Sequence, residues 1–349
     1  MKNILFALMF ALVGCTATED KGSTLLIGTY TDAGSRGIYR TTFSDEGFST
    51  PELVVEVDNP SFLALSDDGG YLYAVSEGGT DATSALNAYR YDATMDSFSL
   101  INRQPTHGAS PCYVCLFDGY AYTANYTGGS FSAFPIGEDG ALGEATEREF
   151  EPREGSASHV HGLFEAPDGK SLYVTDLGRS EIFQIASPTE ELSRYSLAMG
   201  SGPRHMAFSR GGAQAYALNE LKGTVCVFDI GEDGLSLKQE IASDSVGGGG
   251  CADIHLSGDG RFLYASNRLK EDGISVFSVG EGGLLTKVGY TLTGVHPRNF
   301  TFSDDDRYVL VAVRDSDRVE VYSRDAETGL LTATGQSLEL SHPVFLMWM

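Results

Sequence analysis

The sequence predicts an all-β fold, a seven-bladed β-propeller built from four-stranded antiparallel blades. Three observations support this fold class. A hairpin phrase recurs along the chain every 43 to 51 residues, which is the length of a propeller repeat. Helical periodicity is essentially absent after residue 23. The last strand phrase finds its continuation near the other end of the chain, as a closed ring of blades requires.

The hairpin phrase joins two strands through a tight turn. It consists of small or apolar residues, then Asp-Gly, then an aromatic-Leu-Tyr run. Glycine accepts the positive φ of such a turn, so Asp-Gly between two β-rich runs indicates a hairpin. Three close and three looser copies end at Tyr73, Tyr173 and Tyr264 and at Tyr122, Tyr216 and Leu310.

A second phrase precedes each hairpin and marks the first strand of a blade. The seventh copy, residues 342–348, has no hairpin after it, whereas residues 24–30 match a strand that follows one. We therefore expect the C-terminal strand to complete the blade that begins with residues 24–58, which makes residues 24–349 a single domain. A β-sandwich or a solenoid would not predict strands that join the two ends. The seven copies start at Asn59, Ser110, His159, Gly202, Gly250, His296 and His342.

Equivalent positions of the blades form rings around the channel of a propeller. First and second strands are antiparallel neighbours, so the start of one lies beside the end of the other and both rings gather at one mouth. Glu220 and Arg268 follow second strands. Ser, Ala and Val at first-strand positions show that the fold does not demand charge there, so Arg and His indicate chemistry; a merely water-filled polar mouth is the alternative. The first-strand ring contains Ser61, Cys112, His161, Arg204, Ala252, Arg298 and Val344.

These phrases resemble those of the seven-bladed lactonase family, which includes propeller-type 6-phosphogluconolactonases and fungal carboxymuconate cyclases. The resemblance covers the chain after residue 23 and rests on residues 124–130, 200–208, 217–221, 252–264, 267–268 and 297–300. It implies a catalytic group of His161, Arg204 and Glu220. The second arginine of that group is Arg268 or Arg298, and the sequence leaves this choice open.

The resemblance implies a lactone hydrolase, a carboxylic-ester hydrolase most like 6-phosphogluconolactonase, without cofactor or metal. In the expected mechanism Glu220 takes a proton from water and His161 passes it to the leaving alkoxide. Arginines bind a phosphate or carboxylate, or steady the oxyanion. Substrate contacts are expected from Arg268, Arg298, His159 and His296. A muconate-type cycloisomerase and a non-catalytic surface propeller that binds carbohydrate or protein are the alternatives.

The amino-acid composition limits the kinds of partner that the protein can bind. With 24 Lys and Arg against 48 Asp and Glu, the net charge is −24, which excludes a nucleic-acid partner because phosphate binding needs clustered basic residues. The same charge disfavours long-range attraction of an anionic substrate. No apolar run reaches 18 residues, so no membrane span is predicted. The expected partner is a small lactone or sugar acid, and the oligomeric state is not predicted.

Two short patterns have the spacing of metal or redox sites, but strand structure accounts for both of them better. Cys112 and Cys115 form a C-x-x-C pair within a strand, where positions i and i+3 face opposite sides. We expect them, like Cys226 and Cys251, to be small buried residues, although an exported protein could form disulfides. His159 and His161 share the alternation of a metal pair, but no carboxylate aligns with them.

The first residues predict export. Residues 1–14 contain Lys2 and then an apolar run from Ile4 to Val13, which is typical of a signal peptide. The segment ending at Cys15 resembles a bacterial lipobox, which implies cleavage before Cys15 and lipidation of its thiol. Residues 15–23 would be a tether, and the protein would contact a bacterial membrane only through its lipid, on the periplasmic or cell-surface side. An ordinary secretory signal is the alternative.

Overall fold

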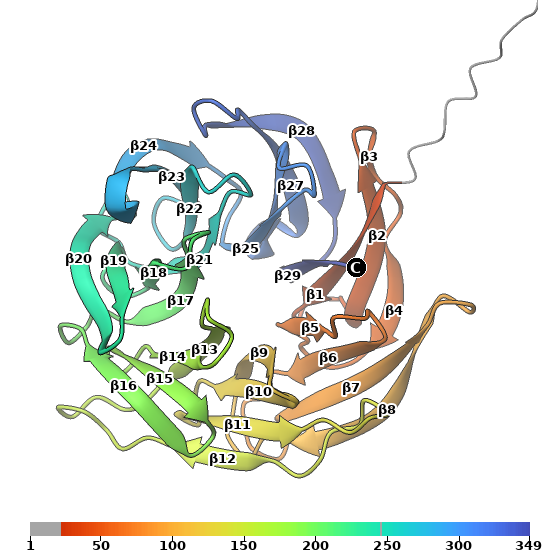
Figure 1. Cartoon of the computed structure of the whole chain (residues 1–349). Coiled ribbons are helices and arrows are strands. Elements are labelled where there is room, and N and C mark those ends of the chain that lie inside the picture. The colour runs from red at the N-terminus through yellow and green to blue at the C-terminus, as the bar shows by residue number, and fades with distance from the viewer. Residues whose placement is uncertain (1–21, 245) are drawn as a thin grey trace, which may run out of the picture.

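Seven β-sheets surround a central channel like the blades of a propeller (Figure 1). The computed structural model describes residues 22–244 and 246–349, so the expected signal peptide and Cys15 lie outside the described residues. The predicted all-β, seven-bladed fold is confirmed. The helices of the described part are two single 3₁₀ turns, η1 (Glu281–Gly283) and η2 (Arg314–Ser316). No helix within it is long and apolar enough to cross a membrane.

Six blades are continuous in sequence, and each has four antiparallel strands in chain order from the channel outward. Their strands are β5 (Leu63–Leu65), β6 (Tyr71–Ser76), β7 (Ala85–Asp92) and β8 (Ser97–Pro105); β9 (Pro111–Phe117), β10 (Tyr120–Asn125), β11 (Ser130–Pro135) and β12 (Thr146–Glu149); β13 (Val160–Glu165), β14 (Leu172–Asp176), β15 (Glu181–Ser187) and β16 (Glu190–Ser196); β17 (Pro203–Phe208), β18 (Gln214–Asn219), β19 (Thr224–Gly231) and β20 (Gly234–Ala242); β21 (Cys251–Leu256), β22 (Phe262–Asn267), β23 (Gly273–Val279) and β24 (Leu285–Leu292); β25 (Pro297–Phe302), β26 (Tyr308–Val313), β27 (Arg318–Arg324) and β28 (Leu331–Glu339).

The seventh blade joins the two ends of the chain. Its strands from the channel outward are β29 (Pro343–Trp348), β1 (Ser23–Thr29), β2 (Gly37–Ser44) and β4 (Glu52–Glu56), with the short β3 (Gly47–Phe48) also paired to β2. β29 runs antiparallel to β1, with Trp348 opposite Leu25. Figure 1 shows the blue strand beside the red one. The predicted closure is confirmed, and β1 begins at Ser23, the last residue of the expected tether.

The recurring turns have a common construction. Ser66, Ser257 and Ser303 each donate a hydrogen bond to the aspartate two residues later, at 2.6, 2.6 and 2.7 Å. The residue that follows has a positive φ in the three turns: 69° at Gly69, 72° at Gly260 and 63° at Asp306. Glycine adopts this conformation without steric cost, and aspartate tolerates it better than most residues. The side-chain oxygen thus fixes the turn while the residue that follows supplies its conformation.

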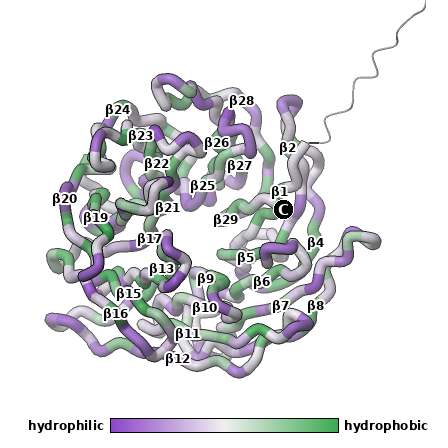
Figure 2. Tube along the Cα trace, in the orientation of Figure 1, coloured by the Kyte–Doolittle hydropathy of each residue, from purple (hydrophilic) through white to green (hydrophobic). Residues whose placement is uncertain are grey.

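The core lies between neighbouring blades. The tyrosine that ends each close hairpin phrase is buried on the second strand. The Tyr73 hydroxyl donates to the Gly140 carbonyl at 3.1 Å and the Tyr264 hydroxyl to the Gly329 carbonyl at 2.6 Å, so both bonds reach the next blade. Figure 2 shows hydrophobic segments along the strands and hydrophilic segments at many of the loops. Each sheet therefore buries both faces against its neighbours.

Both predicted rings gather at one end of the channel, which we call the site mouth. In β17 and β18, Pro203 at the start of the inner strand lies opposite Asn219 at the end of the next. The same register places Cys251 opposite Asn267. Residues that begin inner strands and residues that follow second strands therefore share this end of the ring.

Candidate active site

A carboxylate between two arginines forms the centre of the site mouth. Glu220 follows β18, Arg204 is the second residue of β17, and Arg268 follows β22. Oε2 of Glu220 lies 2.9 Å from Nε of Arg204, as an ion pair whose angle is not that of an aligned hydrogen bond. Oε1 of Glu220 lies 3.1 Å from Arg268 Nη2. Three residues from two blades are thereby joined, as the sequence predicted.

Arg268 also connects the centre to His296. Its Nε donates to the Gly250 carbonyl at 2.9 Å, and its Nη1 lies 3.1 Å from His296 Nε2. Burial lowers the pKa of Arg268 to about 10, although Glu220 opposes this. Burial and the positive charge of Arg268 lower the pKa of His296 to about 3, so at neutral pH the imidazole is uncharged and accepts the hydrogen bond from the guanidinium.

His161 lies buried on β13, beside the centre. Its Nδ1 is 3.8 Å from the Cys112 Sγ, and its ring meets those of Tyr126 and His205 edge-on at 5.6 and 5.4 Å. Burial, then the positive charge of Arg204, holds the pKa of His161 well below its usual range. His161 is therefore a neutral imidazole at pH 7, able to accept a proton.

His159 contacts Tyr126, one of the rings that also meet His161. Its Nδ1 lies 2.9 Å from the Tyr126 carbonyl oxygen, and its ring stacks on the Tyr126 ring at 4.6 Å. Because Tyr126 also touches His161, the two histidines face the same tyrosine. His159 therefore has an indirect place at the site, through Tyr126.

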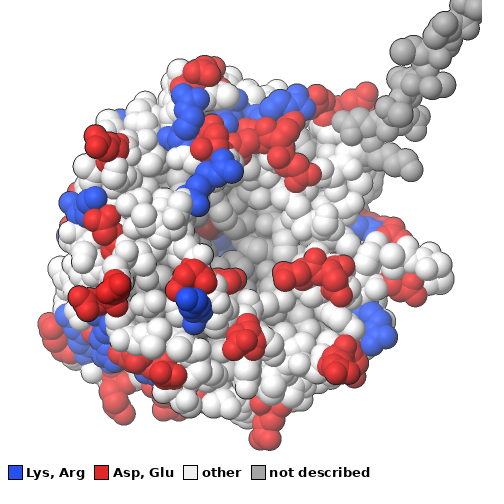
Figure 3. Space-filling model, viewed as in Figure 1, with Lys and Arg blue, Asp and Glu red and all other residues white. Residues whose placement is uncertain are grey.

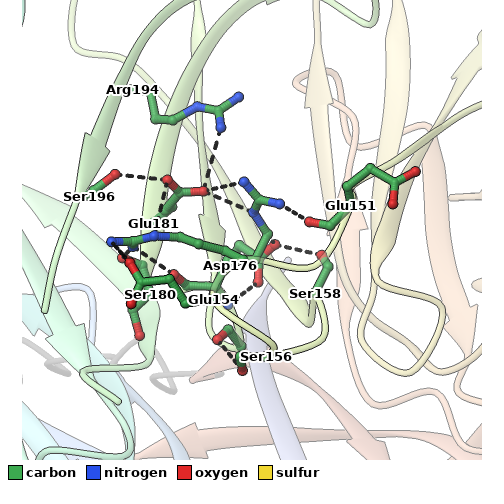
Figure 4. A network of polar contacts seen from close by, with 12 residues as sticks. Glu151, Glu154, Ser156, Ser158, Asp176, Ser180, Glu181, Arg194 and Ser196 are labelled. Carbon is green, nitrogen blue, oxygen red and sulfur yellow. Dashed lines mark hydrogen bonds and ion pairs between the residues drawn. The ribbon is translucent and has the colours of Figure 1, made fainter. Parts of the chain in front are cut away.

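A buried polar network fixes the segment that leads into β13 (Figure 4). Asp176 accepts hydrogen bonds from the Ser158 hydroxyl at 2.5 Å and from the His159 amide at 2.9 Å. Beside it, Glu181 accepts bonds from Arg179 at 2.6 Å and from Ser196 at 2.8 Å. The backbone that carries His159 and His161 is thus fixed to the second strand of its own blade.

Arg298 stands in a separate group of the mouth. Its guanidinium lies over the ring of Tyr30, 5.2 Å from the centroid, and its Nη2 is 3.8 Å from Glu77 Oε2. The Tyr30 hydroxyl donates to the same Glu77 oxygen at 3.0 Å. Burial disfavours the charge of Arg298, but neighbouring Tyr30 and Glu77 raise its pKa. Arg268, and not Arg298, is the arginine that contacts Glu220.

Aromatic side chains cross the channel below the mouth. Phe62 meets Tyr113 and Phe345 with ring centroids 4.0 Å apart in both pairs, and Tyr113 meets Phe164 at 5.0 Å. These four residues, which we call the aromatic layer, also line a cavity of about 280 Å³ with later residues of the inner strands. Figure 3 shows that the ring is hollowed at its centre. The layer therefore lies between the site mouth and this cavity.

Four channel residues carry polar groups that the repeat pattern did not assign to the site: Tyr30, Glu77, His205 and Asp253. Tyr30 and Glu77 follow second strands, so the alignment that found Glu220 also contains them. His205 and Asp253 follow ring positions directly, where simple alternation would turn them away from the channel. The pairing register shifts at the start of β17 and of β21, and such a bulge lets consecutive side chains share one side.

The cysteines and the histidine pair take ordinary structural places. Cys112 and Cys115, like Cys226 and Cys251, are free thiols; Cys112, Cys226 and Cys251 are buried as expected, whereas Cys115 is only partly buried. Burial raises the pKa of Cys112 and of Cys115 to about 12. Within residues 22–244 and 246–349 no three His, Cys, Asp or Glu side chains are grouped as metal ligands.

A family model, a related sequence and solved structures all relate this chain to lactonases. Residues 24–348 match the family model described as lactonase, seven-bladed β-propeller. A 6-phosphogluconolactonase of Formosa agariphila is 32% identical over 341 residues, which is 90% of this chain and 96% of the relative. A Bacteroides fragilis protein solved as a candidate 6-phosphogluconolactonase is 41% identical, with a TM-score of 0.89 over 95% of this chain and 99% of that one.

A periplasmic gluconolactonase of Pseudomonas aeruginosa is 31% identical, with a TM-score of 0.88 over 94% of this chain and 99% of that chain. The family model therefore spans all seven blades. The chain belongs to the lactonase family of seven-bladed β-propellers.

Proposed function

We propose that this protein hydrolyses the lactone of a sugar acid at the site mouth, as a 6-phosphogluconolactonase-like enzyme. The observation that carries the proposal is the cluster of a neutral His161, the Arg204–Glu220–Arg268 group and Arg298 at one end of the channel. A lactone is an ester, so its hydrolysis needs an activated water and a stabilised oxyanion. The cluster holds a group suited to each task.

His161 is proposed to take the proton from the attacking water. Its neutral imidazole can accept a proton, and its Nδ1 faces Cys112 at 3.8 Å, which leaves Nε2 for the water. In ring opening the water oxygen bonds to the lactone carbonyl carbon, the ring C–O bond breaks, and the imidazolium returns the proton to the leaving alkoxide. This role differs from the sequence expectation, in which Glu220 was the base.

Glu220 is proposed to hold the arginines in place. Both of its oxygens are engaged by guanidinium groups, at 2.9 and 3.1 Å, which argues for an aligning role. A guanidinium held this way can present further N–H donors to the oxyanion that forms on the lactone carbonyl. Arg204 and Arg268 are the candidates for that contact, with His296 supporting Arg268.

Arg298 is proposed to bind the anionic group of the substrate or product. Within the described residues its guanidinium makes no hydrogen bond, and its nearest carboxylate oxygen is 3.8 Å away. A planar guanidinium with unused donors is suited to bidentate binding of a phosphate or a carboxylate. A phosphate and a carboxylate both suit this position. Rates for substrates with and without phosphate distinguish the two groups.

We propose further that the protein is exported and anchored by lipid at Cys15, as its lipobox-like segment predicts. The periplasmic description of the Pseudomonas aeruginosa relative supports export. Export favours a lactone without phosphate, because sugar phosphates belong to the cytoplasm. Labelling with a radioactive fatty acid should mark the wild-type protein and leave Cys15→Ala unlabelled; equal labelling of both would contradict the anchor.

Lactone hydrolysis by the purified protein tests the central proposal. δ-Lactones and γ-lactones, each with and without phosphate, would be followed by acid release. We expect hydrolysis by the wild type and background rates for Glu220→Gln and His161→Gln, with unchanged far-UV circular dichroism. Failure on every lactone would favour a binding scaffold, and conversion of a muconate-type acid instead would favour the cycloisomerase. Full activity of Glu220→Gln would show that Glu220 has no role in the reaction.

A further inference from the structure

Asp253 is a buried carboxylate below the site mouth that accepts hydrogen bonds from three inner strands. It belongs to β21, and its Oδ1 lies 2.8 Å from His205 Nδ1 on β17. Its Oδ2 lies 2.9 Å from His255 Nε2 and 2.5 Å from Asn299 Nδ2 on β25, and the Phe300 amide donates to it at 3.2 Å. This number of donors fixes both position and charge of the carboxylate.

The charge of Asp253 determines which nitrogen of His205 carries a proton. Burial opposes ionisation, but the charge of His255 and the hydrogen bonds from His205 and His255 lower the pKa of Asp253. An ionised carboxylate only accepts, so His205 must donate from Nδ1. Burial, then the charge of Arg204, lowers the pKa of His205 to about 4. The ring is therefore neutral, and Nε2 carries a lone pair.

That lone pair faces the site. His205 Nε2 lies 3.3 Å from Nη1 of Arg204, which also donates to the Ala252 carbonyl oxygen. Arg204 is 2% exposed, so a donor left without a partner there could not turn to water. The three acceptors around Arg204 are Glu220, the Ala252 carbonyl and His205. Of these, only the imidazole changes from acceptor to donor by a change of tautomer, without taking up a proton.

We propose that His205 and Asp253 are positioning residues for lactone hydrolysis, in which Asp253 holds His205 in the tautomer that accepts from Arg204 and so orients its guanidinium. This inference rests on the proposed function for its catalytic consequence. The relay is a chain of contacts from β21 and β17 to the residue after β18: it runs from Asp253 to His205, then to Arg204, and ends at Glu220. His205 and Asp253 line the cavity that also contains the aromatic layer, so they would act on the reaction through Arg204 and not by contact with the substrate.

Variants at His205 separate positioning from packing. His205→Phe keeps a ring among Phe62, Tyr113 and Phe164, which it meets at 6.2, 5.5 and 5.9 Å, but removes the acceptor. His205→Gln can place an amide oxygen near the Nε2 position. We expect kcat/KM to fall about 10- to 100-fold in His205→Phe, mainly through kcat, and to recover in His205→Gln.

The Arg204→Ala variant shows whether the effect of His205→Phe on activity depends on Arg204. In Arg204→Ala, a further His205→Phe change should cost no more activity, because the two residues act as a unit. Asp253→Asn should lower kcat/KM in the same way as His205→Phe. Its matched control is Asp259→Asn, which removes a carboxylate of the same β21–β22 hairpin, bonded to Ser257 and Arg324 on the opposite side of the ring from the site mouth. A full additional loss in the double variant would overturn the proposal.

Nitrogen NMR of histidine tests the inference without any activity. At pH 7 the wild-type protein should show His205 protonated at Nδ1 and unprotonated at Nε2, and Asp253→Asn should change this state. The Nη1 protons of Arg204, which face His205, should exchange with water faster in His205→Phe than in the wild type. An Nε2–H tautomer in the wild type, or unchanged Arg204 exchange, would refute the relay even if lactones are hydrolysed. The expected spectra in a protein that hydrolyses no lactone would instead refute only the proposed function.

Discussion

The three arginines of the site mouth differ in what their guanidinium groups already bind. Arg204 and Arg268 share Glu220, whereas Arg298 lies over Tyr30 with its nearest carboxylate oxygen 3.8 Å away. Two buried positive charges and one negative charge leave the first group with a net attraction for an oxyanion. The third arginine keeps its donors for a separate negative group, so binding and chemistry are assigned to different arginines.

The assignment of Arg298 predicts a selective binding defect. Arg298→Gln should raise KM for an anionic lactone about tenfold or more, because a charged hydrogen bond is lost, while KM for the uncharged lactone changes little. Steady-state kinetics on a matched pair of substrates measures this. Equal changes for both substrates would contradict a role in anion binding, and Arg36→Gln, on an exposed side chain that pairs with Glu56, serves as the control.

The neutral state of His161 predicts the pH dependence. A base is active unprotonated, and burial with Arg204 nearby holds the pKa of His161 well below 6.5. Acidification therefore should not remove activity near pH 6.5. We expect kcat/KM to fall only well below that pH, measured from pH 4 to 8 with the spontaneous hydrolysis subtracted. An acid limb centred at 6.5 or above would contradict His161 as the base.

At the scale of the element, the polar network behind β13 maintains the position of the histidines. Asp176 ends β14 and holds the backbone amide of His159 and the Ser158 hydroxyl. The bonds lie inside the blade, so their loss cannot be compensated fully by water. The network in Figure 4 therefore connects the stability of this blade to the placement of His161.

Asp176→Asn should test that connection. We expect a loss of about 1–3 kcal/mol in the free energy of unfolding together with a lower kcat, measured by urea denaturation and by rate on the same sample. Ser158→Ala removes one donor but leaves the carboxylate on the His159 amide, and should cost less of both. A stability loss with unchanged kcat would show that His161 keeps its place without the network.

The geometry of the strands also explains how much of the site could be predicted from the sequence. Repeat alignment located Arg204, Glu220 and Arg268 because strand starts and strand ends recur at fixed offsets from each hairpin. It could not locate His205 or Asp253, since the register shifts in β17 and β21 come from backbone pairing and leave no mark in residue type. The choice between Arg268 and Arg298 likewise depended on side-chain direction, which spacing does not encode.

For the whole molecule, a net charge of −24 opposes the approach of an anion. Figure 3 shows acidic groups spread around the hollowed centre of the ring. Arg204 and Arg268 are paired with Glu220, so their attraction for an anion falls off over a short distance. Long-range repulsion and local attraction therefore work at different distances, and dissolved salt screens the longer one first.

Ionic strength should consequently change the rate for one class of substrate. As salt rises from about 0.01 to 0.15 M, the Debye length falls from about 30 to 8 Å. We expect kcat/KM for a phosphorylated lactone to increase over this range and that for an uncharged lactone to stay constant. Initial rates at low substrate concentration measure both. A decrease for the phosphorylated lactone would mean that the local arginines dominate the approach.

The place where β1 begins sets which face of the ring the proposed lipid anchor would hold near a membrane. Thr29 ends β1 at the site mouth, opposite Pro343, whereas Ser23 starts it at the other face, where its hydroxyl donates to Asp304 at 2.8 Å. The lipid anchor proposed at Cys15 is eight peptide steps before Ser23, a reach of at most about 28 Å. An anchor of this length at Cys15 would hold the face that carries Ser23 toward the bilayer. The site mouth would then face away from the membrane, toward the compartment that supplies a water-soluble lactone.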